Sequence, residues 1–196
     1  MIYWITWVFV RLIRIFFFPL KVYGQKNIPS KGAFILASNH RSHLDPIIIP
    51  ICCARRISFL AKDSLFKNKI FGWYLKKLEA FPIKRETSDI RAIKEIIRRL
   101  QSNLPVLMFP EGTRVREGAE SEVQAGIGFI AFKTGLPVIP VYVSGTDKVF
   151  PPGSRTVKRY PAVVRFGEPI SFLKSDLPYL KIAEKIMEKV ESLAKE

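Results

Sequence analysis

His40 and Asp45 combine residue types and a spacing that suit acid–base chemistry. Both follow the apolar run 33–37, which predicts a buried strand, and α/β proteins place their chemistry just past such strand ends. A carboxylate can orient the imidazole, fix its tautomer and stabilise the imidazolium that forms. We therefore predict His40 as a general base oriented by Asp45. The alternative is a purely structural histidine. His43 competes for the base role, but we expect it to pack or to support the site.

A second polar cluster follows the apolar run 106–108 in the same way. Glu111, Gly112, Thr113 and Arg114 offer a carboxylate, a flexible turn, a hydroxyl and a guanidinium. A guanidinium binds phosphate oxygens in bidentate fashion, whereas we expect Glu111 to pair with a cation or a ligand hydroxyl. The alternative is a turn with a surface ion pair. Two strand-end clusters in one small domain suggest one shared site.

The elements that must position these clusters alternate along the chain. Helical periodicity falls between strand-like runs, which lie at 33–38, 57–61, 80–83, 106–109, 138–143 and 162–166. Helices are expected after Ser88-Asp89, at 127–134 before Gly135, and after Ser175-Asp176. This alternation predicts a single α/β domain with a mostly mixed β-sheet flanked by helices.

The first twenty residues form an apolar segment that contains Arg11 and Arg14. A secretory signal peptide is disfavoured because no small-residue cleavage site follows and the arginines interrupt the apolar run. The segment is long enough for a transmembrane span, but each arginine costs roughly 2.5–3.5 kcal/mol at the bilayer centre. A helix packed on the core of its own domain is a third possibility.

A helical projection favours a fourth possibility, an amphipathic helix at the membrane interface. Arg11 and Arg14 share a face with Trp4, Trp7 and Phe18. The opposite face is wholly apolar and consists of Ile2, Ile5, Phe9, Leu12, Ile13 and Phe16. Cations beside tryptophans suit the lipid headgroup region. We therefore expect a membrane-associating helix at 1–20 and an α/β domain at 21–196.

The overall charge favours an anionic partner. Lys and Arg number 32 against 17 Asp and Glu, which gives a formal net charge of +15, yet 48% of the 196 residues are hydrophobic. An anionic membrane surface accounts for both features, and no basic–aromatic motif of a nucleic-acid module is present. Cys52 and Cys53 show no zinc-type spacing, so we expect no metal site and two core thiols.

Taken together, the clusters resemble a known family. Residues 39–45 and 109–114 look like the first and third blocks of the glycerolipid acyltransferases, and most closely those of bacterial 1-acylglycerol-3-phosphate (lysophosphatidic acid) acyltransferases. The second block is similar at 80–85 and the fourth at 138–141, in the order of the family. The chain departs at Glu79, where the second block of the family often has glycine.

The resemblance implies a reaction. His40, oriented by Asp45, would take a proton from the sn-2 hydroxyl of lysophosphatidic acid, which would attack an acyl-CoA or acyl carrier protein thioester and yield phosphatidic acid. Lys62, Arg85 and Arg114 would hold the phosphate, and Glu111, Gly112 and Thr113 would complete the acceptor site. Lys62 has the alternative of a solvated surface lysine.

The resemblance also implies a setting. No metal or organic cofactor is expected, and the protein would be a peripheral or monotopic membrane protein on the cytoplasmic face of the inner membrane. Another lysophospholipid or a lyso-ornithine lipid remains an alternative acceptor. A non-catalytic protein that binds anionic membranes or nucleic acid is an alternative from another class.

Overall fold

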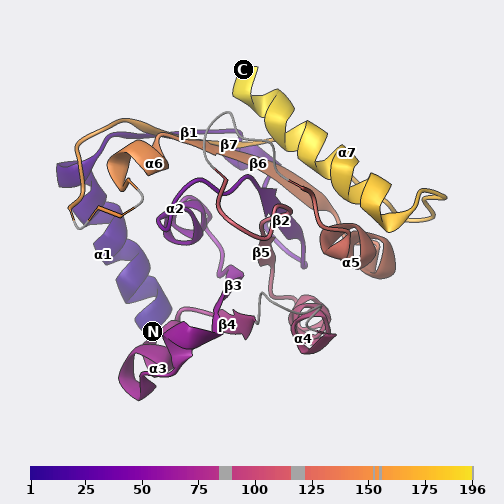
Figure 1. Ribbon diagram of the computed structural model, residues 1–196, viewed down its shortest axis with the longest axis horizontal. Helices are drawn as coiled ribbons and strands as arrows, with labels where there is room; N and C mark the ends of the chain where they lie inside the picture. Colours follow the sequence, from indigo (N-terminus) through magenta and orange to yellow (C-terminus); the bar gives the residue numbers. More distant parts are fainter. Residues whose placement is uncertain (84–89, 116–121, 152, 155, 196) are drawn as a thin grey trace.

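A seven-stranded sheet forms the centre of the computed structural model, which describes residues 1–83, 90–115, 122–151, 153–154 and 156–195. The strand order is β1-β7-β6-β2-β5-β3-β4 (Figure 1). The bounds are β1 Leu20–Tyr23, β2 Ile35–Ser38, β3 Ser58–Lys62, β4 Ala80–Ile83, β5 Val106–Met108, β6 Val138–Ser144 and β7 Ala162–Phe166. Five adjacent strands from β6 to β4 run parallel, and the pair β1 and β7 runs opposite to them. The predicted mixed sheet is confirmed.

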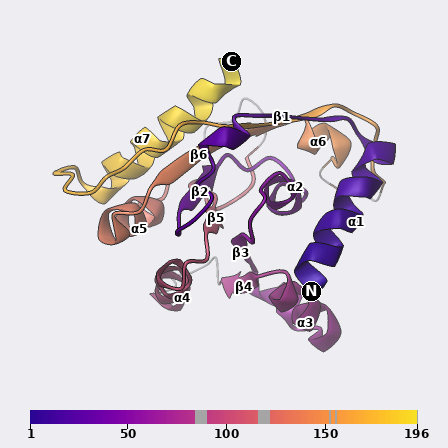
Figure 2. The ribbon, with the colours of Figure 1, turned by 180° about the vertical axis from the view of Figure 1, so that it is seen from behind.

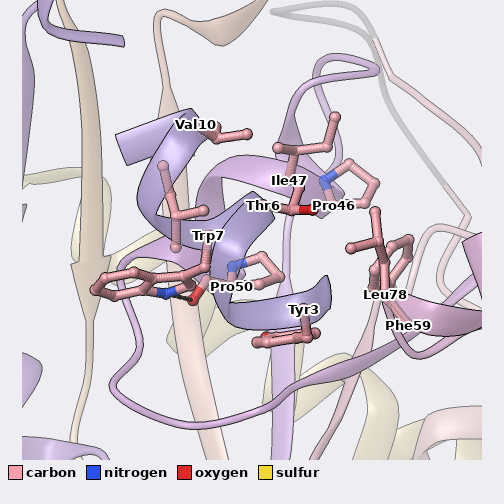
Figure 3. A pocket seen from close by; sticks show the side chains of 10 residues that line it. Tyr3, Thr6, Trp7, Val10, Pro46, Ile47, Pro50, Phe59 and Leu78 are labelled. Carbon is pink, nitrogen blue, oxygen red and sulfur yellow. Dashed lines mark hydrogen bonds between the residues drawn. The ribbon is translucent and has the colours of Figure 1, made fainter. Parts of the chain in front are cut away.

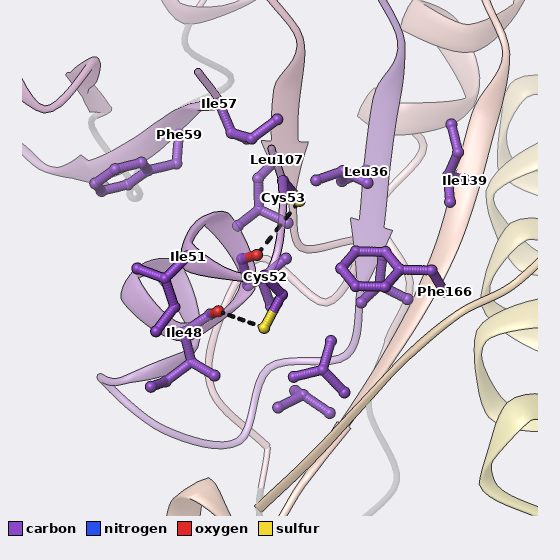
Figure 4. Close-up of a cluster of buried hydrophobic side chains, with 14 of the residues drawn as sticks. Leu36, Ile48, Ile51, Cys52, Cys53, Ile57, Phe59, Leu107, Ile139 and Phe166 are labelled. Carbon is purple, nitrogen blue, oxygen red and sulfur yellow. Dashed lines mark hydrogen bonds between the residues drawn. The ribbon is translucent and has the colours of Figure 1, made fainter. Parts of the chain in front are cut away.

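Helices cover both faces of this sheet (Figures 1 and 2). On one face α4 (Ile90–Gln101), α5 (Gly126–Thr134) and α7 (Tyr179–Ser192) pack on a core that includes Ile35, Val106 and Val138. On the other face α1 (Ile2–Phe17), α2 (Asp45–Ile51) and α6 (Thr146–Val149) pack on a second core (Figure 4). α3 (Lys69–Lys77) precedes β4, and short 3-10 helices lie at Gln25–Asn27, Asp63–Phe66 and Leu193–Lys195.

The second core contains the two cysteines. Cys52 and Cys53 are buried free thiols, as predicted, and each Sγ contacts a carbonyl oxygen one helical turn earlier in α2. Burial raises the pKa of the Cys52 thiol to about 12. These thiols therefore stay protonated and act as packing groups.

Most elements agree with the sequence patterns, with two kinds of difference. β1, α2, α3 and α6 were not predicted. β1 has no buried residue, α2 contains Pro50, α3 buries only Gly72 and Leu75, and α6 has only four residues. α7 begins at Tyr179 instead of directly after Ser175-Asp176, since Pro178 occupies the N-cap position. The predicted helix cap Ser88-Asp89 lies outside the described residues.

One side of α1 packs onto the domain. The Tyr3 hydroxyl accepts the Ile57 N–H at 2.9 Å, and burial raises the pKa of Tyr3 to about 12. The hydroxyl groups of Thr6 and Tyr74 share a hydrogen bond of 2.9 Å. The indole of Trp7 donates to the carbonyl oxygens of Pro50 and Cys53. The Arg11 guanidinium lies 4.6 Å from the centre of the Trp7 ring, as the shared face predicted, but the indole N–H of Trp7 faces α2 and not the headgroup region.

The other side of α1 is exposed and apolar. Its members are Trp4, Ile5, Val8, Phe9, Leu12, Ile15, Phe16 and Phe17. Four of these, namely Ile5, Phe9, Leu12 and Phe16, belong to the apolar face that the projection gave. No helix in the described ranges has both the length and the hydropathy that a membrane crossing needs. The helix thus both packs on its domain and leaves an apolar face uncovered.

Candidate active site

Three adjacent parallel strands end at the same edge of the sheet and deliver the polar residues of the site. β2 lies between β6 and β5, and all three run in the same direction. Asn39 and His40 follow β2, Phe109 and Glu111 follow β5, and Thr146 follows β6. The carboxyl ends of parallel strands meet at one edge, so segments far apart in the sequence come together there.

His40 and Asp45 form a buried pair at this edge. The distance from His40 Nδ1 to Asp45 Oδ2 is 2.9 Å, and the exposed fractions of the two residues are 5% and 0%. Asp45 Oδ2 also accepts the backbone N–H groups of Arg41 and Ser42, each at 2.7 Å. Because a carboxylate only accepts, the neutral imidazole donates through Nδ1–H, which leaves the lone pair on Nε2. The imidazole is thereby prepared to accept a proton at Nε2.

Thr146 holds the second oxygen of Asp45. Its hydroxyl donates to Asp45 Oδ1 at 2.6 Å, and its side chain is fully buried. Thr146 begins α6 directly after Gly145, which has φ 79° and lies so close to Pro161 O that a Cβ atom would meet it at 2.2 Å. Only glycine fits both constraints, so Gly145 fixes the turn that aims Thr146 at Asp45. Sequence analysis gave Thr146 no role.

The backbone of the His40 segment is held from both neighbouring strands. Glu111 Oε2 accepts the His40 N–H at 2.7 Å, and the His40 carbonyl accepts the Val115 N–H at 2.9 Å. The side-chain amide of Asn39 accepts the N–H of Val143 and donates to its carbonyl, both at 2.8 Å. This amide extends the pairing of β2 with β6 by one residue after the strand ends.

Phe109 fixes the plane of the imidazole. The two rings stack with their centroids 4.0 Å apart and an interplanar angle of 20°. Phe109 was part of the sequence cluster, but its role was not predicted, because its ring meets His40 only when β5 lies beside β2. One face of the imidazole is therefore covered by an aromatic ring.

The residues predicted to bind the acceptor divide into a buried part and an exposed part. Glu111 is buried against the His40 backbone, while Thr113 and Arg114 are exposed. Gly112 makes the turn between them with φ 66°, and its N–H donates to Phe109 O at 3.0 Å. Glu111 thus holds the backbone of His40, a role that sequence analysis did not assign to it.

The predicted cations follow neighbouring strands. Lys62 is exposed at the end of β3, which pairs with β5 in parallel, and Arg114 follows β5. Arg85 follows β4, which pairs with β3, but it lies outside the described residues. His43 is exposed and is not part of the His40–Asp45 pair. Lys62 and Arg114 therefore follow β3 and β5, the two strands next to β2 on one side, and these strands end at the edge where His40 lies.

An apolar pocket lies between α1 and α2. Pro46, the residue after Asp45, lines it together with Ile47 from α2 and Trp7 from α1 (Figure 3). The further lining residues are Tyr3, Thr6, Val10, Pro50, Ile51, Phe59 and Leu78. Such a lining suits a hydrocarbon group and disfavours a charged one.

Comparisons with known proteins agree on one family. The family model described as "Acyltransferase" matches residues 19–144. A 1-acyl-sn-glycerol-3-phosphate acyltransferase of Bacillus subtilis is 30% identical over 175 residues, which cover 89% of this chain and 84% of the relative. A chloroplast 1-acyl-sn-glycerol-3-phosphate acyltransferase of Arabidopsis thaliana is 30% identical over 179 residues, which cover 89% of this chain and 50% of the relative.

A solved structure agrees as well. The crystal structure of the 1-acyl-sn-glycerophosphate (LPA) acyltransferase PlsC from Thermotoga maritima matches this chain with a TM-score of 0.77 and 30% sequence identity. The match covers 95% of this chain and 76% of the PlsC chain. The chain spans about half the length of the curated plant relatives that it matches. The matched segment contains the His40–Asp45 pair, the segments after β2 and β5, and β6 up to its last residue, Ser144. The chain belongs to the acyltransferase family.

Proposed function

We propose that the protein transfers a fatty acyl group from a thioester to the sn-2 hydroxyl of lysophosphatidic acid and so makes phosphatidic acid. The observation that carries this proposal is the buried His40–Asp45 pair, with Nε2 as the basic nitrogen, in a member of the acyltransferase family. The names of the relatives and of the structural neighbour support lysophosphatidic acid as the acceptor.

The proposed reaction has two proton transfers and one acyl transfer. His40 Nε2 takes the proton of the acceptor hydroxyl as its oxygen bonds to the thioester carbonyl carbon, which gives a tetrahedral oxyanion. When the oxyanion collapses, the carbon–sulfur bond breaks, and the imidazolium returns the proton to the leaving thiolate. Asp45 stabilises the imidazolium between these steps, and no covalent enzyme intermediate forms.

The acceptor phosphate is assigned to three cations. Arg114 binds phosphate oxygens in bidentate fashion, and Lys62 and Arg85 add positive charge. Gly112 and Thr113 shape the turn before Arg114, and Glu111 holds the backbone of the base. This chemistry uses acyl-CoA or an acyl carrier protein as co-substrate and needs no metal or organic cofactor.

Both substrates carry acyl chains, which suits a reaction at a membrane surface. The apolar pocket between α1 and α2 would take one hydrocarbon chain. The exposed apolar face of α1 would lie in the headgroup region of the cytoplasmic face of the inner membrane, as a peripheral or monotopic attachment. The net charge of +15 favours an anionic bilayer.

The test is acyl transfer from a radiolabelled acyl thioester to lysophosphatidic acid in mixed micelles. We expect product with the wild-type protein and a rate that is lower by about 10²–10⁴-fold with His40→Ala. His43→Ala is the matched control and should keep most of the activity, because His43 is exposed and outside the pair. Equal rates for wild type and His40→Ala would contradict the proposal.

A panel of acceptors separates the remaining possibilities. Product with lysophosphatidylglycerol or a lyso-ornithine lipid, and none with lysophosphatidic acid, would keep the mechanism and change the acceptor. A non-catalytic protein that binds anionic membranes or nucleic acid would transfer nothing to any acceptor, and its binding would follow salt concentration alone.

A further inference from the structure

The outer side of α3 is a second exposed apolar surface. Ile70 and Trp73 lie one helical turn apart with exposed fractions of 82% and 53%, and Phe71 is 45% exposed. The opposite side of the helix is buried through Gly72 and Leu75. Hydrophobic residues therefore point outward from a short helix whose other side packs against the domain.

The same segment is positively charged. Between Ser64 and Leu78 the sequence has four lysines and no Asp or Glu. Lys69, Lys76 and Lys77 are exposed, and Lys77 Nζ lies 5.8 Å from the centre of the Trp73 ring. A tryptophan and an isoleucine beside ammonium groups suit the headgroup region of an anionic bilayer. There the apolar parts of these side chains contact lipid, while the indole N–H and the ammonium groups stay in contact with water.

α3 lies beside α1 and contacts the side of α1 that packs onto the domain. The hydroxyl groups of Thr6 and Tyr74 join the two helices, and Leu78 lines the same pocket as Tyr3 and Thr6. Both helices lie along one edge of the molecule, at the left in Figure 1 and at the right in Figure 2. α7, with its solvated Lys and Glu residues, lies on the opposite side.

We propose that α3 is a second membrane-contacting element, which inserts Ile70 and Trp73 into the headgroup region of an anionic bilayer beside α1. The inference rests on the proposed function, because it extends the membrane attachment that α1 provides. Contact through two helices at an angle fixes the tilt of the domain, whereas a single helix leaves it free to rotate about the helix axis. The apolar pocket is lined by residues of α1 and by Leu78, the residue after α3, so this tilt also sets how the pocket faces the bilayer.

An environment-sensitive maleimide dye attached to Ile70→Cys tests the insertion directly. Cys52 and Cys53 are buried, so the dye reacts with the introduced thiol. The control is the same dye on Leu180→Cys, an exposed position on α7. With vesicles of phosphatidylcholine and phosphatidylglycerol, we expect a blue shift and quenching by spin-labelled lipid at position 70 and neither effect at position 180.

Two sets of variants measure the contribution to binding. Ile70→Ser with Trp73→Ser should weaken vesicle co-sedimentation by about tenfold or more, since two apolar side chains no longer insert. Leu180→Ser should leave it unchanged. Lys69→Gln with Lys76→Gln should weaken binding only when phosphatidylglycerol is present.

The possible failures are distinguishable. If the protein sediments with vesicles while position 70 stays in water, α3 is not inserted and the attachment by α1 stands. If the wild-type protein does not bind vesicles at all, both membrane contacts are wrong, and acyl transfer in micelles still tests the catalysis by itself. A dye response at position 70 to an acidic acyl carrier protein, with none to vesicles, would assign α3 to that protein and overturn the proposal.

Discussion

The two halves of the site are built on opposite principles. His40 and Asp45 are buried, and both carboxylate oxygens of Asp45 are hydrogen-bonded. Lys62 and Arg114, which we assign to the phosphate, are exposed at strand ends. Within the described residues, no buried side-chain nitrogen or oxygen lacks a hydrogen-bond partner.

This contrast suggests a division of labour. A base must sit within a fraction of an ångström of its proton, and a buried, fully hydrogen-bonded pair supplies that accuracy before the substrate arrives. Exposed cations can adjust to headgroups and attract anions from solution, but salt screens them. Changes in the buried half should therefore lower kcat, and changes in the exposed half should raise KM.

Asp45→Asn should give the largest effect. The amide can present N–H to His40 and so reverse the tautomer, and its NH₂ group conflicts with the N–H groups of Arg41 and Ser42. We expect kcat to fall by about 10²–10⁴ with a small change in the KM of the acceptor. Steady-state kinetics at several pH values measure this. If kcat/KM fell through a higher KM alone, the proposed difference between the buried pair and the exposed cations would be wrong.

Thr146→Val should give the next effect, because it removes a hydrogen bond to a buried charge without changing the shape of the side chain. Such a bond contributes about 1.5–3 kcal/mol, so kcat should fall by about tenfold to a hundredfold. Thr146→Ser keeps the hydroxyl and should restore most of the activity. If Val and Ser behave alike, Thr146 only packs.

Arg114→Gln should affect the exposed half. We expect the KM of lysophosphatidic acid to rise by about tenfold or less at low salt, and the difference from wild type to shrink as salt is added. The value of kcat should change little. Lys133→Gln removes an equally exposed cation in α5 and serves as the matched control. A lower kcat in Arg114→Gln would mean that this guanidinium takes part in the acyl-transfer step, which contradicts its assignment to substrate binding alone.

Glu79 should give the smallest effect, and one on stability alone. It has φ 65°, in the left-handed region that favours glycine, and its carboxylate is paired with Arg56 and Arg99. Glu79→Ala loses the ion pairs and keeps the strain, while Glu79→Gly relieves it, so Gly should be more stable by about 1 kcal/mol. Denaturant titration measures the difference. Glu79 lies directly before the start of β4, whereas the site lies where the parallel strands end. Activity in micelles should therefore not change in either variant.

Glu79 also shows what the sequence predicts well. The similarity to the family marked this position as one where glycine is common, and the backbone has the conformation that explains it. The strands were predicted because apolar runs such as 106–108 are buried on both faces of a sheet. His40 and Asp45 were predicted because one local segment holds both.

What was missed depends on contacts between distant segments. Thr146 and Asp45 meet only because β6 lies beside β2, and Phe109 stacks on His40 only because β5 lies on the other side. α3 was missed for another reason. Its apolar residues point outward, so the pattern that normally marks the buried side of a helix is inverted.

The hydrogen bond between Asp45 and Thr146 has a consequence for how the protein is made. The two residues are 101 positions apart. Ribosomes add about 5–20 residues per second, so about 5–20 seconds separate their synthesis. During that interval β1 has no β7 and β2 has no β6 to pair with, while the apolar α1 has already been made. If α1 attaches the chain to a membrane as we propose, this attachment can precede the completion of the His40–Asp45–Thr146 network.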